Sequence, residues 1–178
     1  TIIRTKIKKD IKYYTPRLSS TGKHIAYLSN DMGRYRVHLK NTETNKTKVI
    51  FRGGFKTNTL FTDESLPLIA WEPSGKKLAI INDKRSNIYI TFYDIETKKK
   101  EKNPIRKFQK IVSFGYTDSK QLVMSAVQNG QTDIFLYNIA STTIRKLTDD
   151  YFDDLYPEYI KADSVRGIMF ASNRDGEI

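Results

Sequence analysis

Hydrophobic residues occur in short runs along this chain, and turn-forming residues separate the runs. Between Thr15 and Gly33 this pattern predicts a short strand, a tight turn that closes at Gly22, a second strand from Ile25, and a polar turn before a third strand. Third strands of the same kind are predicted over residues 35–40, 88–93 and 133–138, the first of which alternates with a period of two. The chain is therefore predicted to be all-β.

The strand–turn–strand pattern recurs along the chain. Its turn positions are Gly22, Gly75, Ser119 and Val165, and the steps between them are 53, 44 and 46 residues. An apolar residue follows three positions after each of them: Ile25, Leu78, Leu122 and Ile168. Repeats of this length built from short strands indicate a β-propeller, in which each repeat forms one four-stranded antiparallel blade.

The first repeat also carries a resemblance to a known family. Residues 16–23, Pro-Arg-Leu-Ser-Ser-Thr-Gly-Lys, followed by Ile-Ala-Tyr, resemble the TolB-type propeller repeat, whose phrase is Pro, any residue, an aromatic or apolar residue, Ser-Pro-Asp-Gly-Lys, then a strand. Residues 153–157 and 170–176 are similar to other phrases of that repeat. The chain departs from the pattern where Ser20-Thr21 replaces Pro-Asp and where the third copy lacks the glycine. The resemblance implies a TolB-like propeller, related to the N-terminal propeller of dipeptidyl peptidase IV-type proteins.

The repeats predict a single partial propeller over residues 1–178, with about three and a half blades. Residues 1–7 are expected to form the outer strand of a preceding blade. Complete blades are expected at 15–51, 66–108 and 111–148, and an incomplete blade at 155–178. Because such an arc cannot close a ring, we interpret it as a piece of a longer propeller or as a complete propeller seen in part.

Composition and charge narrow the class of protein. With 38% hydrophobic and 29% charged residues the 178-residue chain is globular, and no apolar run approaches membrane-spanning length. The absence of cysteine excludes disulfides and cysteine metal sites. The formal charge of +11 raises the question of an anionic partner. Lys98, Lys99 and Lys100 are candidate binding residues for an acidic ligand; the alternative is that they protect blade edges from pairing.

Acidic and aromatic residues gather near the predicted fourth blade. Oxygen-rich loops can hold calcium, so Asp149, Asp150, Asp153 and Asp154 are weak metal candidates, although their spacing does not match an EF-hand. Pairing with nearby lysines, and bonds to their own backbone, are the alternative roles. Tyr151, Phe152 and Tyr156 are candidate binding residues on one face of the propeller, or else pack blade on blade.

Few other side chains offer chemistry. Trp71 and Leu18 occupy equivalent repeat positions and are predicted to pack between blades. His24 and His38 have no carboxylate or nucleophile at a spacing typical of a catalytic site. The pattern G-x-S-x-G, which marks the nucleophilic serine of many hydrolases, is absent. No cofactor or metal is therefore expected, and no catalytic residue is assigned.

The leading interpretation is a non-catalytic binding or scaffold module with a protein partner. The TolB-type resemblance implies a periplasmic or secreted protein of the bacterial envelope. Nucleic acid is disfavoured because no single-strand-binding motif accompanies the positive charge. One alternative is the substrate-gating propeller of a larger serine peptidase of the prolyl oligopeptidase or dipeptidyl peptidase IV type. A propeller that binds or cleaves an acidic saccharide is a weaker alternative.

Overall fold

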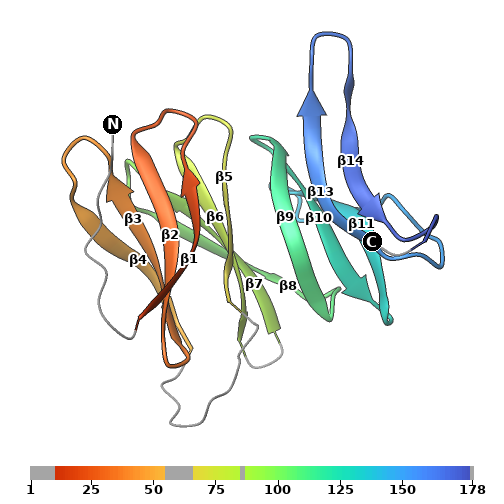
Figure 1. The fold of residues 1–178 in the computed structure, drawn as a ribbon, viewed down its shortest axis with the longest axis horizontal. Helices are drawn as coiled ribbons and strands as arrows, with labels where there is room; N and C mark the ends of the chain where they lie inside the picture. The colour runs from red at the N-terminus through yellow and green to blue at the C-terminus, as the bar shows by residue number, and fades with distance from the viewer. Residues whose placement is uncertain (1–10, 55–65, 85–86, 177–178) are drawn as a thin grey trace. The chain divides into compact units, whose positions relative to one another are not determined.

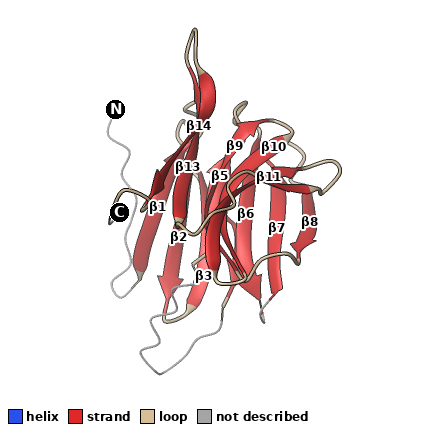
Figure 2. Ribbon diagram, turned by 90° about the vertical axis from the view of Figure 1, so that its right-hand side faces the viewer, coloured by secondary structure: helices blue, strands red, loops and turns tan. Residues whose placement is uncertain are grey.

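The computed structural model describes residues 11–54, 66–84 and 87–176, which form strands and loops (Figures 1 and 2). Over these ranges no helix of any length occurs, and so none could cross a membrane. The first seven strands are β1 (Lys12–Leu18), β2 (His24–Asp31), β3 (Arg34–Asn41), β4 (Thr47–Gly53), β5 (Leu68–Trp71), β6 (Lys77–Lys84) and β7 (Asn87–Asp94). The others are β8 (Lys100–Ile105), β9 (Lys110–Asp118), β10 (Gln121–Gln128), β11 (Gln131–Asn138), β12 (Ile144–Lys146), β13 (Asp154–Lys161) and β14 (Arg166–Ser172).

Consecutive strands pair with one another to form four separate sheets. Three sheets have four strands, in the orders β1-β2-β3-β4, β5-β6-β7-β8 and β9-β10-β11-β12, and the fourth contains β13 and β14. This is the up-and-down order of propeller blades. The strands β3, β7 and β11 cover the three predicted third strands, and β8 forms where lysines obscure the strand pattern. The predicted outer strand over residues 1–7 lies outside the described residues.

The strands belong to two compact units. Unit 1 contains β1–β6 with residues 91–101, and unit 2 contains β9–β14 with residues 87–90 and 102–105. The core of unit 1 is a cluster in which Leu28, Val37 and Leu39 of the first sheet pack against Leu78 and Ile80 of the second. In unit 2, Val123, Ile134 and Leu136 of the third sheet pack against Ile168 and Phe170 of β14. The single domain over residues 1–178 stays a prediction.

The turn between the third and fourth strands has the same geometry in all three four-stranded sheets. A side-chain oxygen of Asn41, Asp94 or Asn138 accepts a backbone N–H three residues later, at 2.7, 2.8 and 3.0 Å. The residue four positions on has a left-handed backbone: Asn45 (φ 56°), Lys98 (φ 59°) and Thr142 (φ 56°). Each such turn is tied to the turn before it by a backbone N–H that donates to the carbonyl of Lys23, Lys76 or Lys120. The repeat thus fixes the backbone of these turns while their side chains differ.

One turn glycine is required by both conformation and space. Gly75 has φ 72°, and its N–H donates to the Glu72 carbonyl at 2.8 Å. A Cβ added to Gly75 would lie 3.1 Å from the Ser20 hydroxyl oxygen of the neighbouring sheet. The Ser20 hydroxyl also donates to the Pro73 carbonyl at 2.7 Å. The left-handed backbone that Gly75 shares with Gly22 favours glycine at both positions, and the close approach of the two turns adds a steric reason at position 75.

The two predicted inter-blade residues differ in burial. Trp71 packs against the core of unit 1, and its indole N–H donates to the Arg17 carbonyl at 2.9 Å. The prediction for Leu18 is wrong, because its side chain is 60% exposed. A bulge between Tyr14 and Arg17 adds one residue to β1. Tyr14 therefore faces the core, whereas Leu18, opposite Ile25, falls on the other face of the first sheet, away from the second sheet.

Candidate functional site

The acidic residues of the β12–β13 loop are matched by two cations. The Arg174 guanidinium donates to Asp150 at 2.9 Å and to the fully buried Asp154 at 3.2 Å. The Lys146 ammonium lies 2.9 Å from the fully buried Asp133, and it also pairs with Asp149. Hydrogen bonds to Asp149 and then Asp133 raise the pKa of Lys146, which favours its charged form. The loop is therefore a network of ion pairs on one side of unit 2.

Backbone contacts add to the order of this loop. Asp153 accepts the Thr132 N–H at 3.2 Å through its carboxylate, and its own N–H donates to the Asn173 side chain at 2.9 Å. The Gln131 amide donates to the Phe152 carbonyl at 2.9 Å. Among the residues that the structure describes, no group of three or more His, Asp or Glu side chains is arranged to hold a metal ion. The weak metal role of Asp149, Asp150, Asp153 and Asp154 stays a prediction, and ion pairing describes the contacts of Asp149, Asp150 and Asp154.

The three candidate aromatic residues lie on and beside this loop and have different surroundings. Tyr151 is 97% exposed, Tyr156 is 61% exposed, and Phe152 is 39% exposed. The Arg174 guanidinium lies 5.9 Å from the centre of the Phe152 ring and 5.8 Å from that of Phe170. Phe152 is thus partly engaged in holding the loop, whereas the Tyr151 ring extends into solvent.

The candidate lysines lie in unit 1: Lys98 and Lys99 in the turn that joins β7 to β8, and Lys100 at the start of β8. Lys98, Lys99 and Lys100 are all exposed. The Lys99 carbonyl accepts the Asp94 N–H at 3.0 Å, and the Lys100 ammonium lies 6.0 Å from the centre of the Tyr93 ring. The aromatic candidates belong to unit 2, so the two predicted groups lie in different units.

Both histidines lie in the first sheet and contact aromatic rings, His38 within that sheet and His24 across to the second sheet. The His38 ring stacks on Tyr27 with ring centres 4.8 Å apart, and its Nε2 lies 2.7 Å from the Ser29 hydroxyl oxygen. Burial, and then the charges of Arg36 and Arg52, lower the pKa of His38. Burial, and then Lys48, lower the pKa of His24, whose ring lies 6.4 Å from that of Trp71. Both rings therefore favour the neutral form.

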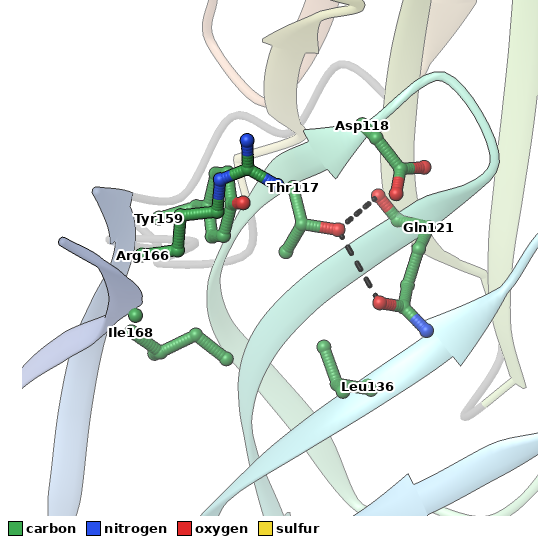
Figure 3. A pocket seen from close by; sticks show the side chains of 8 residues that line it. Thr117, Asp118, Gln121, Leu136, Tyr159, Arg166 and Ile168 are labelled. Atoms are coloured by element: carbon green, nitrogen blue, oxygen red, sulfur yellow. Dashed lines mark hydrogen bonds between the residues drawn. The ribbon is translucent and has the colours of Figure 1, made fainter. Parts of the chain in front are cut away.

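Unit 2 also contains an open pocket of about 260 Å³ that the sequence does not predict. Thr117 and Asp118 end β9 and Gln121 begins β10, while Tyr159 and Arg166 reach the pocket from the β13–β14 hairpin (Figure 3). The Thr117 hydroxyl donates to the backbone and side-chain oxygens of Gln121 at 3.3 and 3.4 Å, and Asp118 accepts the Lys120 N–H at 2.7 Å. The remaining lining residues are Leu136, Gly167 and Ile168.

The lining of this pocket is mixed. One cation and one carboxylate, Arg166 and Asp118, line it together with the apolar side chains of Leu136 and Ile168. The two groups of lining residues are about forty positions apart in the chain and meet only because the hairpin packs on the third sheet. No spacing in the sequence could have brought them together, which is why they were missed.

Solved structures of TolB and of peptidases have folds similar to that of this chain. No family model matches the sequence. TolB from Acinetobacter baumannii superimposes on 90% of this chain and 40% of its own length, with a TM-score of 0.66 and 17% identity. The β-propeller domain of the Trilobed protease from Pyrococcus furiosus matches 97% of this chain and 57% of its own, with a TM-score of 0.62 and 14% identity. A prolyl endopeptidase matches 93% of this chain and 25% of its own, with a TM-score of 0.65 and 10% identity.

These similarities confirm the predicted all-β propeller fold and its likeness to TolB and to the propellers of peptidases. The chain spans 40% and 57% of the length of the first two proteins. The neighbours include both TolB and peptidases, so they support a propeller module without distinguishing its role.

Proposed function

We propose that this chain is a non-catalytic propeller module that binds a protein partner in the bacterial envelope, with the β12–β13 loop as its contact surface. The observation that carries the proposal is Tyr151, which is 97% exposed on a loop held by ion pairs and hydrogen bonds. A few aromatic side chains usually supply most of the affinity of an interface. A loop that is ordered before binding loses less conformational freedom when the partner arrives. The envelope location rests on the resemblance to the TolB-type repeat.

The contact is tested by photo-crosslinking in the full-length protein, produced in its own host. The photoreactive residue p-benzoylphenylalanine replaces Tyr151, and the matched control replaces Val165, which is 58% exposed at the turn of the β13–β14 hairpin. We expect one discrete cross-linked partner from position 151 and none from 165. Tyr151→Ala should then weaken binding of that partner by about 30-fold without affecting folding, as for an interface hot spot. Equal cross-linking from both positions, or unchanged affinity in Tyr151→Ala, would reject the loop as the contact surface.

The substrate-gating propeller of a larger serine peptidase is the second candidate. The similarity to the propellers of the Trilobed protease and of a prolyl endopeptidase favours it. Such a protein needs a hydrolase domain with a nucleophilic serine in a G-x-S-x-G turn. A fluorophosphonate probe that labels a serine of the folded full-length protein supports this candidate. A folded protein that stays unlabelled excludes it and leaves the binding module.

A further inference from the structure

Four turns of unit 1 come together at one end of its two sheets, and we name this surface the turn end. The turns are residues 19–23 and 42–46 of the first sheet and 72–76 and 95–99 of the second. Within each sheet a backbone bond joins the two turns: the Thr42 N–H donates to the Lys23 carbonyl, and the Ile95 N–H donates to the Lys76 carbonyl. Between the sheets, the Ser20 hydroxyl donates to the Pro73 carbonyl. The turn end is therefore one continuous surface.

Lysine dominates the turn end. The carbonyls of five exposed lysines accept turn hydrogen bonds of 2.9 to 3.0 Å, which fix the main chain at these positions: Lys23, Lys46, Lys76, Lys77 and Lys99. Three more exposed lysines lie within or next to the turns: Lys48, Lys98 and Lys100. The exposed carboxylates at this end are Glu43, Glu96 and Glu101. Lys76 and Glu96 approach only to 3.9 Å. The surface therefore carries a clear excess of positive charge.

At the position of Lys46 and Lys99 the fold does not require a charge, whereas the position of Lys23 and Lys76 is lysine in the third sheet too, at Lys120. In the third sheet the same turn is closed by the Asn138 N–H, which donates at 2.9 Å to the carbonyl of Thr143, at the position that Lys46 and Lys99 occupy in unit 1. Threonine thus makes the same backbone bond without a charge. Protection against edge pairing accounts for lysines in the outer strands, such as Lys48 and Lys100, but not for lysines in turns.

Charge complementarity indicates what this surface binds. Lysine is depleted at protein–protein interfaces, and arginine is preferred where phosphates of nucleic acids are gripped in pairs. Stacking of bases would need an exposed aromatic face, but Trp71 packs against the core and donates its N–H to Arg17. Clustered lysines that extend from a folded surface are attracted to anionic bilayers, and each adds about fivefold to the partitioning. We propose that the turn end of unit 1 docks reversibly on a membrane rich in anionic phospholipid.

The test is co-sedimentation of the protein with vesicles that contain phosphatidylglycerol and phosphatidylcholine in a ratio of about 3:7, compared with pure phosphatidylcholine. Binding is expected only to the anionic vesicles, and it should be lost when salt screens the charges over a Debye length of about 3 Å near 1 M. The informative variant replaces Lys23, Lys46, Lys76 and Lys99 by Thr, as at Thr143. We expect its partition coefficient to fall about 600-fold, which is about fivefold for each of the four lysines.

A second quadruple variant separates the position of the charges from their number. Its four replacements by Thr are at exposed cationic residues of unit 1 that lie at the opposite ends of their strands from the turn end: Lys12, Arg34, Arg52 and Lys84. Both variants lower the formal charge from +11 by the same four units. The control variant should keep its partition coefficient within about threefold of the unchanged protein, because its four replaced residues lie away from the turn end. Circular dichroism checks that both variants fold.

Three results would overturn the proposal. One is the absence of binding to anionic vesicles at low salt, and another is an equal loss in both quadruple variants, which would mean that only net charge matters. The third comes from competition with a ten-residue glutamate peptide and with a twenty-nucleotide single strand. If either binds the turn end more tightly than the vesicles do, the occupant is an acidic polymer and not a membrane. None of these results bears on the Tyr151 loop, which belongs to unit 2.

Discussion

Removal of the Arg174 guanidinium should destabilise unit 2 far more than the loss of an ordinary surface ion pair. Asp154 is fully buried, and its carboxylate oxygens accept hydrogen bonds from Arg174 at 3.2 and 3.3 Å. Arg174→Met keeps an apolar stem over the rings of Phe152 and Phe170 but leaves the Asp154 charge without its partner.

The size of the effect follows from burial. Leaving a buried charge unpaired costs about 3–5 kcal/mol of unfolding free energy. Because Arg174 is 40% exposed, water can replace part of its contact with Asp154. We therefore expect Arg174→Met to destabilise unit 2 by about 3 kcal/mol, the lower end of that range. The matched control is Arg34→Met, whose ion pair with Asp31 has both side chains partly exposed, at 44% and 23%. That change should cost at most about 1 kcal/mol.

The assay must report on unit 2. Trp71 is the only tryptophan and lies in unit 1, so its fluorescence does not report directly on the β13–β14 hairpin. Hydrogen exchange of the backbone amides of Ile168 and Phe170, followed by mass spectrometry, measures the free energy of opening at the hairpin itself. The fluorescence-detected urea midpoint serves as the readout of unit 1 for the Arg34→Met control.

A second substitution tests the cause. Asp154→Asn removes the charge, so in the Arg174→Met background it should recover at least 1 kcal/mol of the loss, about a third of the value above. If Arg174→Met changes the opening free energy by less than about 0.5 kcal/mol, the ion pair is an exposed contact of little value. If Asp154→Asn recovers nothing, the loss comes from packing and the charge argument is wrong.

Two predictions concern unit 1, where Trp71 fluorescence detects urea unfolding. Lys98→Asn should stabilise by about 0.5 kcal/mol and Asn45→Lys should destabilise by a similar amount, because asparagine tolerates the left-handed backbone that both positions have; changes of equal sign would contradict this. His38 has a lowered pKa in the folded state, so its contribution to stability is complete above pH 6.5 and falls as the pH drops towards that lowered pKa. When the pH is lowered from 7.5 to 5, the His38→Gln variant should therefore lose less unfolding free energy than the unchanged protein. An equal or greater loss would refute a lowered pKa of His38 in the folded state.

The strands and their order could be predicted because each depends on short stretches of sequence. Glycine at position 75 and the alternation over residues 35–40 both act within a few residues, and they set the turns and the strands of each sheet. The side on which a residue falls was harder to predict. Leu18 pairs with Ile25 as Trp71 pairs with Leu78, but in the first sheet this face points away from the second sheet. One extra residue in β1 puts Tyr14 on the core face instead, and alternation alone does not show such a bulge.

Contacts between distant residues could not be predicted. Arg174 lies in a recognisable turn phrase, but its partners Asp150 and Asp154 precede it by 24 and 20 residues, and only the packing of the loop brings them together. The same holds for the pocket lined by Thr117 and Arg166. The sequence therefore predicts the acidic cluster of this loop, but it does not predict which cations pair with it.

Comparison of equivalent turns distinguishes residues that the fold requires from residues that the fold leaves free to vary. At the closing position of the same turn the chain has Lys46, Lys99 and Thr143, and the three backbone hydrogen bonds are 2.9, 3.0 and 2.9 Å long. Since the bond is the same with and without the charge, the backbone geometry does not determine the side chain at this position. Differences between equivalent turns are thus a place to look for function in such a propeller, whereas the oxygen-bearing side chains of Asn41, Asp94 and Asn138 accept the same backbone N–H in all three turns and report on folding.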